Sequence, residues 1–185
     1  SKLVGMFTKL GGHTDQQAKD LLLGARQLAK ANDVAPDKVL ADVASNTELF
    51  ARFGKDGGEG LLRAAVQARK LGISLDSVAK SADTLLDFQS SINAEVEASM
   101  LLGRDLNLQK ARELSLTNDM EGLQKELVKL VGREAEFNSM NRIQRDALAK
   151  ALGMEVSEIQ KMVTSQNEQK TLQGEINRLT SENEI

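Results

Sequence analysis

Cysteine, tryptophan and tyrosine are absent from this 185-residue sequence, which also has only one proline, Pro36, and one histidine, His13. Without cysteine the chain cannot form a zinc ribbon, a disulfide framework or a thiol nucleophile. A Ser-His-Asp triad would have to use His13 as its base. No apolar run approaches the length of a membrane span, and the first residues lack the order of a signal peptide. The sequence therefore predicts a protein without a metal, a cofactor or an enzymatic site.

Aliphatic residues supply nearly all of the apolar bulk. Hydrophobic residues make up 41% of the chain and aromatic residues only 3%, so that leucine, alanine, valine, isoleucine and methionine must build the core. This composition favours layers of packed helices. The formal net charge of −3 argues against a protein that coats nucleic acid or a membrane surface, because both need a basic face. Because the chain begins Ser1-Lys2, we expect it to be a piece of a longer protein.

Apolar residues recur at helical spacing along nearly the whole chain, and the alternation typical of strands is missing. The predicted fold class is therefore all-α. A capping box at Thr14 and Gln17 begins one helix, and Pro36 begins the next at its first helical position. The glycine-rich stretch Gly54–Gly60 predicts a loop. One further helix is expected to end at Gly72, and the others to cover residues 75–102, 107–116, 119–131, 140–152 and 157 to the end.

A weak repeat marks three places where one helix turns into the next. In each copy a turn residue lies four positions after an alanine, and a valine or isoleucine follows six positions later. The copies are Ala29/Asp33/Val39, Ala68/Gly72/Val78 and Ala149/Gly153/Ile159. They lie 39 and 81 residues apart, which predicts a degenerate copy near Arg112–Leu123. This period is typical of stacked helical hairpins, so we expect helix-corner packing at these residues and a hairpin-repeat region over residues 1–156.

The third copy also resembles a DNA-binding helix-turn-helix. Leu148–Ile159 has the small-residue, glycine and apolar spacing that lets two helices cross closely. The positions that would read bases offer only one positive charge among them: Glu155, Ser157, Gln160, Lys161 and Thr164. Glu155 and Glu158 would face phosphates and be repelled. The pattern favours a structural corner with no specific nucleic acid as partner, and DNA binding is kept as a third interpretation.

Three other features allow a chemical interpretation, and each also has a simpler structural one. Gly54–Gly60 could bind phosphate, but it lacks the Gly-Lys-Ser/Thr ending of a phosphate loop and carries Asp56. His13 follows two glycines, as a surface turn residue does. Carboxylate pairs without a His or Cys partner occur at Asp83/Asp87, Glu95/Glu97 and Glu134/Glu136. We expect a flexible connection, a surface turn and solvated helix faces, respectively.

Residues 157–185 have the heptad spacing of a coiled coil. Two series of residues seven apart interleave as a and d positions. The apolar layers define the expected self-association seam: Met162, Leu172, Ile176 and Leu179. The polar layers are Ser165, Gln169 and Asn183. This pattern predicts a second region, the start of a long coiled-coil-like helix, and a homo-oligomer.

Several segments of the chain resemble a known family. They are Glu48–Lys55, Leu85–Phe88, Leu101–Leu114, Val131–Asn138 and Met140–Arg145. Together they resemble the tail tape measure proteins of long-tailed bacteriophages, particularly those with contractile tails. The likeness extends over Glu48–Val163.

The resemblance implies a structural role without catalytic chemistry. Tape measure proteins are long, mostly helical chains that fill the tail tube in several parallel copies, while the tube polymerises around them and its length follows theirs. They leave ahead of the genome at infection, and some then help it to cross the host envelope. The chain would thus lie in the host cytoplasm during assembly and later in the tail lumen of the virion. Its partners would be tail tube and baseplate hub proteins, with membrane contact only during ejection.

A helical-repeat adaptor of another large assembly is the alternative function. Such an adaptor would be monomeric and would offer a defined groove to its partner. The glycine-rich stretch and the repeated corners also interrupt any continuous rod. We therefore expect residues 1–165 to fold back into a compact shape, with the rod beginning around Ser157.

Overall fold

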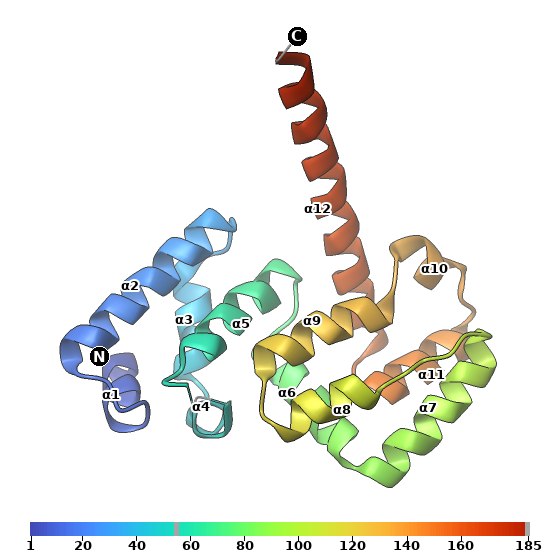
Figure 1. The fold of residues 1–185 in the computed structure, drawn as a ribbon, viewed down its shortest axis with the longest axis horizontal. Coiled ribbons are helices and arrows are strands. Elements are labelled where there is room, and N and C mark those ends of the chain that lie inside the picture. Colours follow the sequence, from blue (N-terminus) through green and yellow to red (C-terminus); the bar gives the residue numbers. More distant parts are fainter. Residues whose placement is uncertain (54–55, 184–185) are drawn as a thin grey trace.

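The structure, a computed structural model, describes residues 1–53 and 56–183. Over these residues the chain forms twelve α-helices and no strand, which confirms the predicted all-α class (Figure 1). The helices are α1 (Lys2–Lys9), α2 (Asp15–Ala31), α3 (Pro36–Ala44), α4 (Thr47–Phe53), α5 (Glu59–Lys70), α6 (Leu75–Leu86), α7 (Phe88–Leu102), α8 (Gln109–Leu116), α9 (Met120–Val131), α10 (Glu134–Ser139), α11 (Arg142–Leu152) and α12 (Val156–Asn183).

Helix starts follow local capping chemistry. The Thr14 side chain accepts from the Gln17 N–H at 3.2 Å, and the Gln17 side chain accepts from the Thr14 N–H at 3.0 Å, so the predicted capping box begins α2. Pro36 begins α3 at the first helical position, where its missing N–H costs nothing. A second capping box, formed by Asn141 and Gln144, begins α11.

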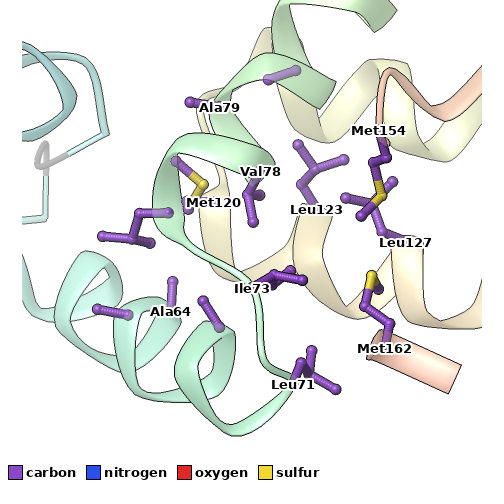
Figure 2. Close-up of a cluster of buried hydrophobic side chains, with 14 of the residues drawn as sticks. Ala64, Leu71, Ile73, Val78, Ala79, Met120, Leu123, Leu127, Met154 and Met162 are labelled. Carbon is purple, nitrogen blue, oxygen red and sulfur yellow. The ribbon is translucent and has the colours of Figure 1, made fainter. Parts of the chain in front are cut away.

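One apolar cluster extends from Met6 in α1 to Val163 in α12. Helix α5 lies at its centre, beside α3 and α9. Arg69 of α5 donates through Nε and Nη2 to Asp42 of α3 at 2.6 and 2.7 Å. This hydrogen bonding raises the pKa of Arg69 above its usual value. Arg63 of α5 pairs with Glu121 of α9 at 2.8 Å. Figure 2 shows the part of the cluster where α5, α6, α9 and the start of α12 meet.

The single helix predicted over residues 75–102 is wrong, because the chain bends at Asp87 (φ −80°, ψ 82°) into α6 and α7. The apolar stripes explain the bend. Leu75, Val78, Ala82 and Leu85 are buried in α6, whereas α7 buries Ser91, Ala94 and Ala98. At 100° per residue, these two stripes would lie roughly 170° apart on one straight helix. The bend turns both stripes toward the core.

Three short helices were not predicted, namely α1, α4 and α10. Each has six to eight residues, which is too short for an apolar period to be distinguished from chance. Gly54 and Lys55 of the predicted loop lie outside the described residues. Asp56 accepts hydrogen bonds from the N–H groups of Gly58 and Gly60 at 3.1 and 3.0 Å, and α5 begins at Glu59. The aspartate therefore caps a helix start instead of opposing a bound anion.

Candidate interaction surfaces

Four helix-to-helix corners share one backbone geometry. Their turn residues adopt a left-handed conformation: Asp33 (φ 57°), Gly72 (φ 79°), Asn118 (φ 60°) and Gly153 (φ 66°). The N–H that follows each turn residue donates to a carbonyl five residues back, at 2.9–3.0 Å from Val34 to Ala29, Ile73 to Ala68, Asp119 to Leu114 and Met154 to Ala149. This is the bonding of a Schellman motif, which satisfies carbonyls at the end of the first helix.

The corner at Asn118 lies inside Arg112–Leu123, where the repeat spacing placed a degenerate copy. It joins α8 to α9, and Asp119 caps α9 by accepting from the Gly122 N–H at 2.8 Å. Gly72 and Gly153 use glycine for the left-handed turn, whereas the other two corners use Asp and Asn, the non-glycine residues that tolerate it best.

The alanine, valine and isoleucine side chains of the repeat are buried where two helices cross, as predicted. Six of them are buried, with exposed fractions of 6% or less: Ala29, Val39, Ala68, Val78, Ala149 and Ile159. Of the two turn glycines, Gly72 is exposed and Gly153 half-buried. An added Cβ at Gly153 would overlap the side chain of Thr84 in α6, so this corner needs glycine both for its conformation and for its close approach to α6.

The start of α12, which resembles a recognition helix, packs against neighbouring helices. Glu158 accepts a hydrogen bond from the Ser77 hydroxyl of α6, and Ser165 donates to the Leu71 carbonyl at 3.2 Å. Lys161 lies against the corner at Gly72. Glu158 also accepts from the Glu155 N–H at 3.0 Å, so it caps its own helix. The start of α12 is therefore engaged in packing against α6 and the end of α5.

Five of the six candidate carboxylates make separate structural contacts, each with a different partner. Asp83 pairs with Arg52 at 2.8 Å, and Asp87 accepts from the Ser90 hydroxyl at 3.1 Å. The other contacts are Glu95 with Arg112 at 3.1 Å, Glu97 with Lys150 at 4.0 Å and Glu136 with Arg133 at 3.1 Å. His13 Nε2 lies 2.7 Å from the Gly57 carbonyl and connects the start of α2 to the turn before α5. Among residues 1–53 and 56–183, no cluster of three His, Cys, Asp or Glu could hold a metal ion.

The expected self-association seam divides into two parts. Leu172, Ile176 and Leu179 are 63, 46 and 46% exposed on the half of α12 that leaves the body of the molecule (Figure 1). Met162 is instead fully buried, close to Leu127 of α9 (Figure 2). Met162 is therefore a core residue and is unavailable to a second copy, which corrects its assignment to the seam. The side chain of Asn183 lies outside the described residues.

The compact body extends further along α12 than the predicted boundary at residue 156. Ile159, Met162 and Val163 are buried in the common core, and Ser165 still bonds to the end of α5. From Thr171 to Glu182 every residue is exposed. The projecting part of the helix, called distal α12 below, is therefore residues 171–183.

A groove of about 920 Å³ separates distal α12 from the corner between α2 and α3. Leu172 and Ile176 form part of one wall, and Val34 and Lys38 form part of the other. Two residues of the seam, Leu172 and Ile176, therefore face this groove.

A second apolar surface was not anticipated from the sequence. Phe88, Ile92, Val96 and Met100 form an exposed row along α7, called the α7 ridge below. Because α7 also buries residues on its opposite face, its apolar pattern has no single preferred side, and the helical period alone could not show which residues face outward.

Comparison with known proteins identifies no relative, since no family model, curated protein or solved structure matches this chain. Over the described part of the chain, no helix combines the length and apolar character that crossing a membrane requires.

Proposed function

We propose that this chain is a structural, non-enzymatic segment of a phage tail tape measure protein. In this role it associates with parallel copies of itself inside the tail, is enclosed by tail tube and baseplate hub proteins, helps to set tail length during assembly, and is released ahead of the genome. The observation that supports the proposal best is distal α12, a helix that leaves the folded body and presents Leu172, Ile176 and Leu179 along one side. The resemblance over Glu48–Val163 supplies the family.

The seam has the composition of a weak two-stranded coiled coil. Ile176 occupies an a position, and Leu172 and Leu179 occupy d positions, a combination that favours two parallel strands. The six aliphatic side chains of a two-stranded seam contribute about 1.5–3 kcal/mol each when fully buried, or about 9–18 kcal/mol together, and association costs about 4–15 kcal/mol in lost translational and rotational freedom, so that little is left over. Three apolar layers therefore hold copies together only where they are concentrated, as in a tube lumen. This suits a chain that must later be released.

The test is tail length measured by electron microscopy after an insertion into distal α12. Eight heptads, about 56 residues, inserted after Thr180 should lengthen the tail by roughly 84 Å at the helical rise of about 1.5 Å per residue. The control is an insertion of equal length, rich in glycine and serine, between α7 and α8, which should leave the length unchanged. Normal tails of unaltered length with the helical insertion would contradict the ruler role.

The helical-repeat adaptor is a second candidate function, and the groove between distal α12 and the α2–α3 corner is the observation that favours it. An adaptor would have a molecular mass that does not change with concentration. Substitution of Val34 or Lys38 would then abolish partner capture, although neither lies in the α12 seam.

A further inference from the structure

The groove beside distal α12 has apolar side chains on both of its walls. Leu172 and Ile176, which are 63 and 46% exposed, lie on the α12 wall. Val34 and Ala35 lie on the opposite wall, at the α2–α3 corner. Each wall therefore carries apolar surface of the kind that would cover the other, so these two seam residues have a matching surface within their own chain.

The charges along the groove also match across it. They are Asp33, Lys38, Arg69 and Lys70 on the wall of the corner and α5, and Glu168 and Lys170 on the α12 wall. Arg69 is already paired with Asp42, but over residues 1–53 and 56–183 the other five form no ion pair. Lys70 donates to the neutral Asn32 side chain at 3.0 Å. Glu168 thus has unpaired lysines across the groove, and Lys170 has an unpaired aspartate.

Distal α12 is anchored to the body only at its lower end. Among the described residues, Ser165 is the last residue of α12 that bonds to another part of the chain, through its 3.2 Å hydrogen bond to the Leu71 carbonyl. Ile176 lies eleven residues beyond it, about 16 Å along the helix. A helix curves without a proline or a local defect as long as the bend stays below about 20°. Such a bend beyond Ser165 would move Ile176 by about 5 Å, so distal α12 can approach the corner as an intact helix.

We propose that distal α12 closes onto the α2–α3 corner, so that the two apolar walls meet and Glu168 approaches Lys70. The closed state is in equilibrium with the open arrangement described above. Closing covers Leu172 and Ile176, two of the three exposed residues of the seam, so a closed chain does not pair with a second copy. This consequence rests on the proposed self-association, whereas the closure itself does not.

The experiment traps the closed state in the full chain, which has no cysteine of its own. Ala35→Cys and Gln173→Cys place one thiol on each wall, and a disulfide requires their Cα atoms to come within about 7 Å. In dilute solution under mild oxidation, this pair should form an intramolecular disulfide at least about tenfold faster than the control pair Ala35→Cys and Thr171→Cys. Thr171 is exposed and lies about 160° around the helix from Gln173, away from the groove. Equal rates for the two pairs would overturn the closure.

Two sets of substitutions in the trapping pair test what draws the walls together. Leu172→Gln with Ile176→Gln should slow trapping at least about fivefold, because the apolar contact is lost. Lys70→Glu should slow it about threefold, since an exposed ion pair contributes little, and the addition of Glu168→Lys should restore the rate. All of these residues are at least partly exposed, so circular dichroism should show that every variant is folded. If neither set changes the rate, the thiols meet by undirected motion and the proposal is overturned.

Sedimentation equilibrium of the trapped chain separates the closure from the proposed function. The oxidised chain should stay monomeric at concentrations where the reduced chain associates, and a reductant should restore association. An oxidised chain that associates as readily as the reduced one would show that closing leaves the seam free. A reduced chain that never associates would contradict the proposed self-association, whereas the trapping rates would still decide whether distal α12 closes.

Discussion

Helix α12 is one continuous helix whose two halves are stabilised in different ways. In the proximal half, Val156–Ser165, the apolar residues Ile159, Met162 and Val163 are at most 1% exposed. In distal α12 every residue from Thr171 to Glu182 is exposed. The same heptad series nevertheless connects Met162 to Ile176. A heptad pattern therefore shows which residues need an apolar partner, but does not show whether that partner belongs to the same chain.

The difference has an energetic consequence. The proximal half shares the stability of the whole body, because it cannot unfold without opening the core. Distal α12 has about 13 residues and depends on local propensity, and isolated helices of that length are marginal in water. Gly174 lowers its propensity further. Distal α12 should therefore be the part of the helix that exchanges its amide hydrogens fastest.

Truncation of one apolar residue in each half gives the largest expected contrast. Met162→Ala should lower the free energy of unfolding by about 3 kcal/mol, because it removes a fully buried side chain and leaves a cavity. Leu172→Ala should change it by no more than about 0.5 kcal/mol in dilute solution, since an exposed side chain loses no packing. Urea denaturation followed by circular dichroism measures both values. Equal losses in the two variants would show that Leu172 also packs within its own chain.

The corner that begins the proximal half gives the next largest effect. Gly153→Ala should cost about 3 kcal/mol, because alanine is strained at φ 66° and its Cβ would overlap Thr84. Gly103→Ala is the matched control: it has a similar φ of 68°, but its added Cβ would meet no atom within 4 Å. It should therefore lose only about 1–2 kcal/mol.

Chemical denaturation of the two glycine variants separates backbone strain from close packing. The excess loss in Gly153→Ala measures how tightly the corner holds α12 against α6. If both variants lose the same free energy, the approach of Gly153 to α6 contributes nothing to the anchoring of the proximal half.

The sequence predicted local features, such as helices and corners, better than it predicted which helix faces pack against one another. The all-α class follows from periodicity, and the corner at Asn118 lies where the spacing of the repeat indicated. The bend at Asp87 was missed, although its signal was present: the apolar stripe changes face between Leu85 and Ser91. The α7 ridge left no such signal, because a helix apolar on both faces has no periodic preference.

The seam shows why surface sites are the harder part to predict. Met162 and Ile176 occupy equivalent heptad positions, and only the path of the chain decides that α9 covers one and that the other is exposed. Burial of Met162 results from contacts with residues more than thirty positions away, such as Leu127. A pattern within a single helix contains no information about such contacts.

The smallest expected effect comes from glycine to alanine changes in two exposed helical positions. An added Cβ meets no atom within 4 Å at either Gly174 of distal α12 or Gly24 of α2. Each substitution should favour its helix by about 0.5–1 kcal/mol. In Gly24→Ala this gain should raise the urea midpoint without changing the helical signal, because α2 is already fully formed as part of the body. In Gly174→Ala it should increase the ellipticity at 222 nm and leave the midpoint unchanged, because distal α12 frays independently of the core. A shift of the midpoint in Gly174→Ala would mean that distal α12 is coupled to the body, and the division of α12 into two independent halves would then be wrong.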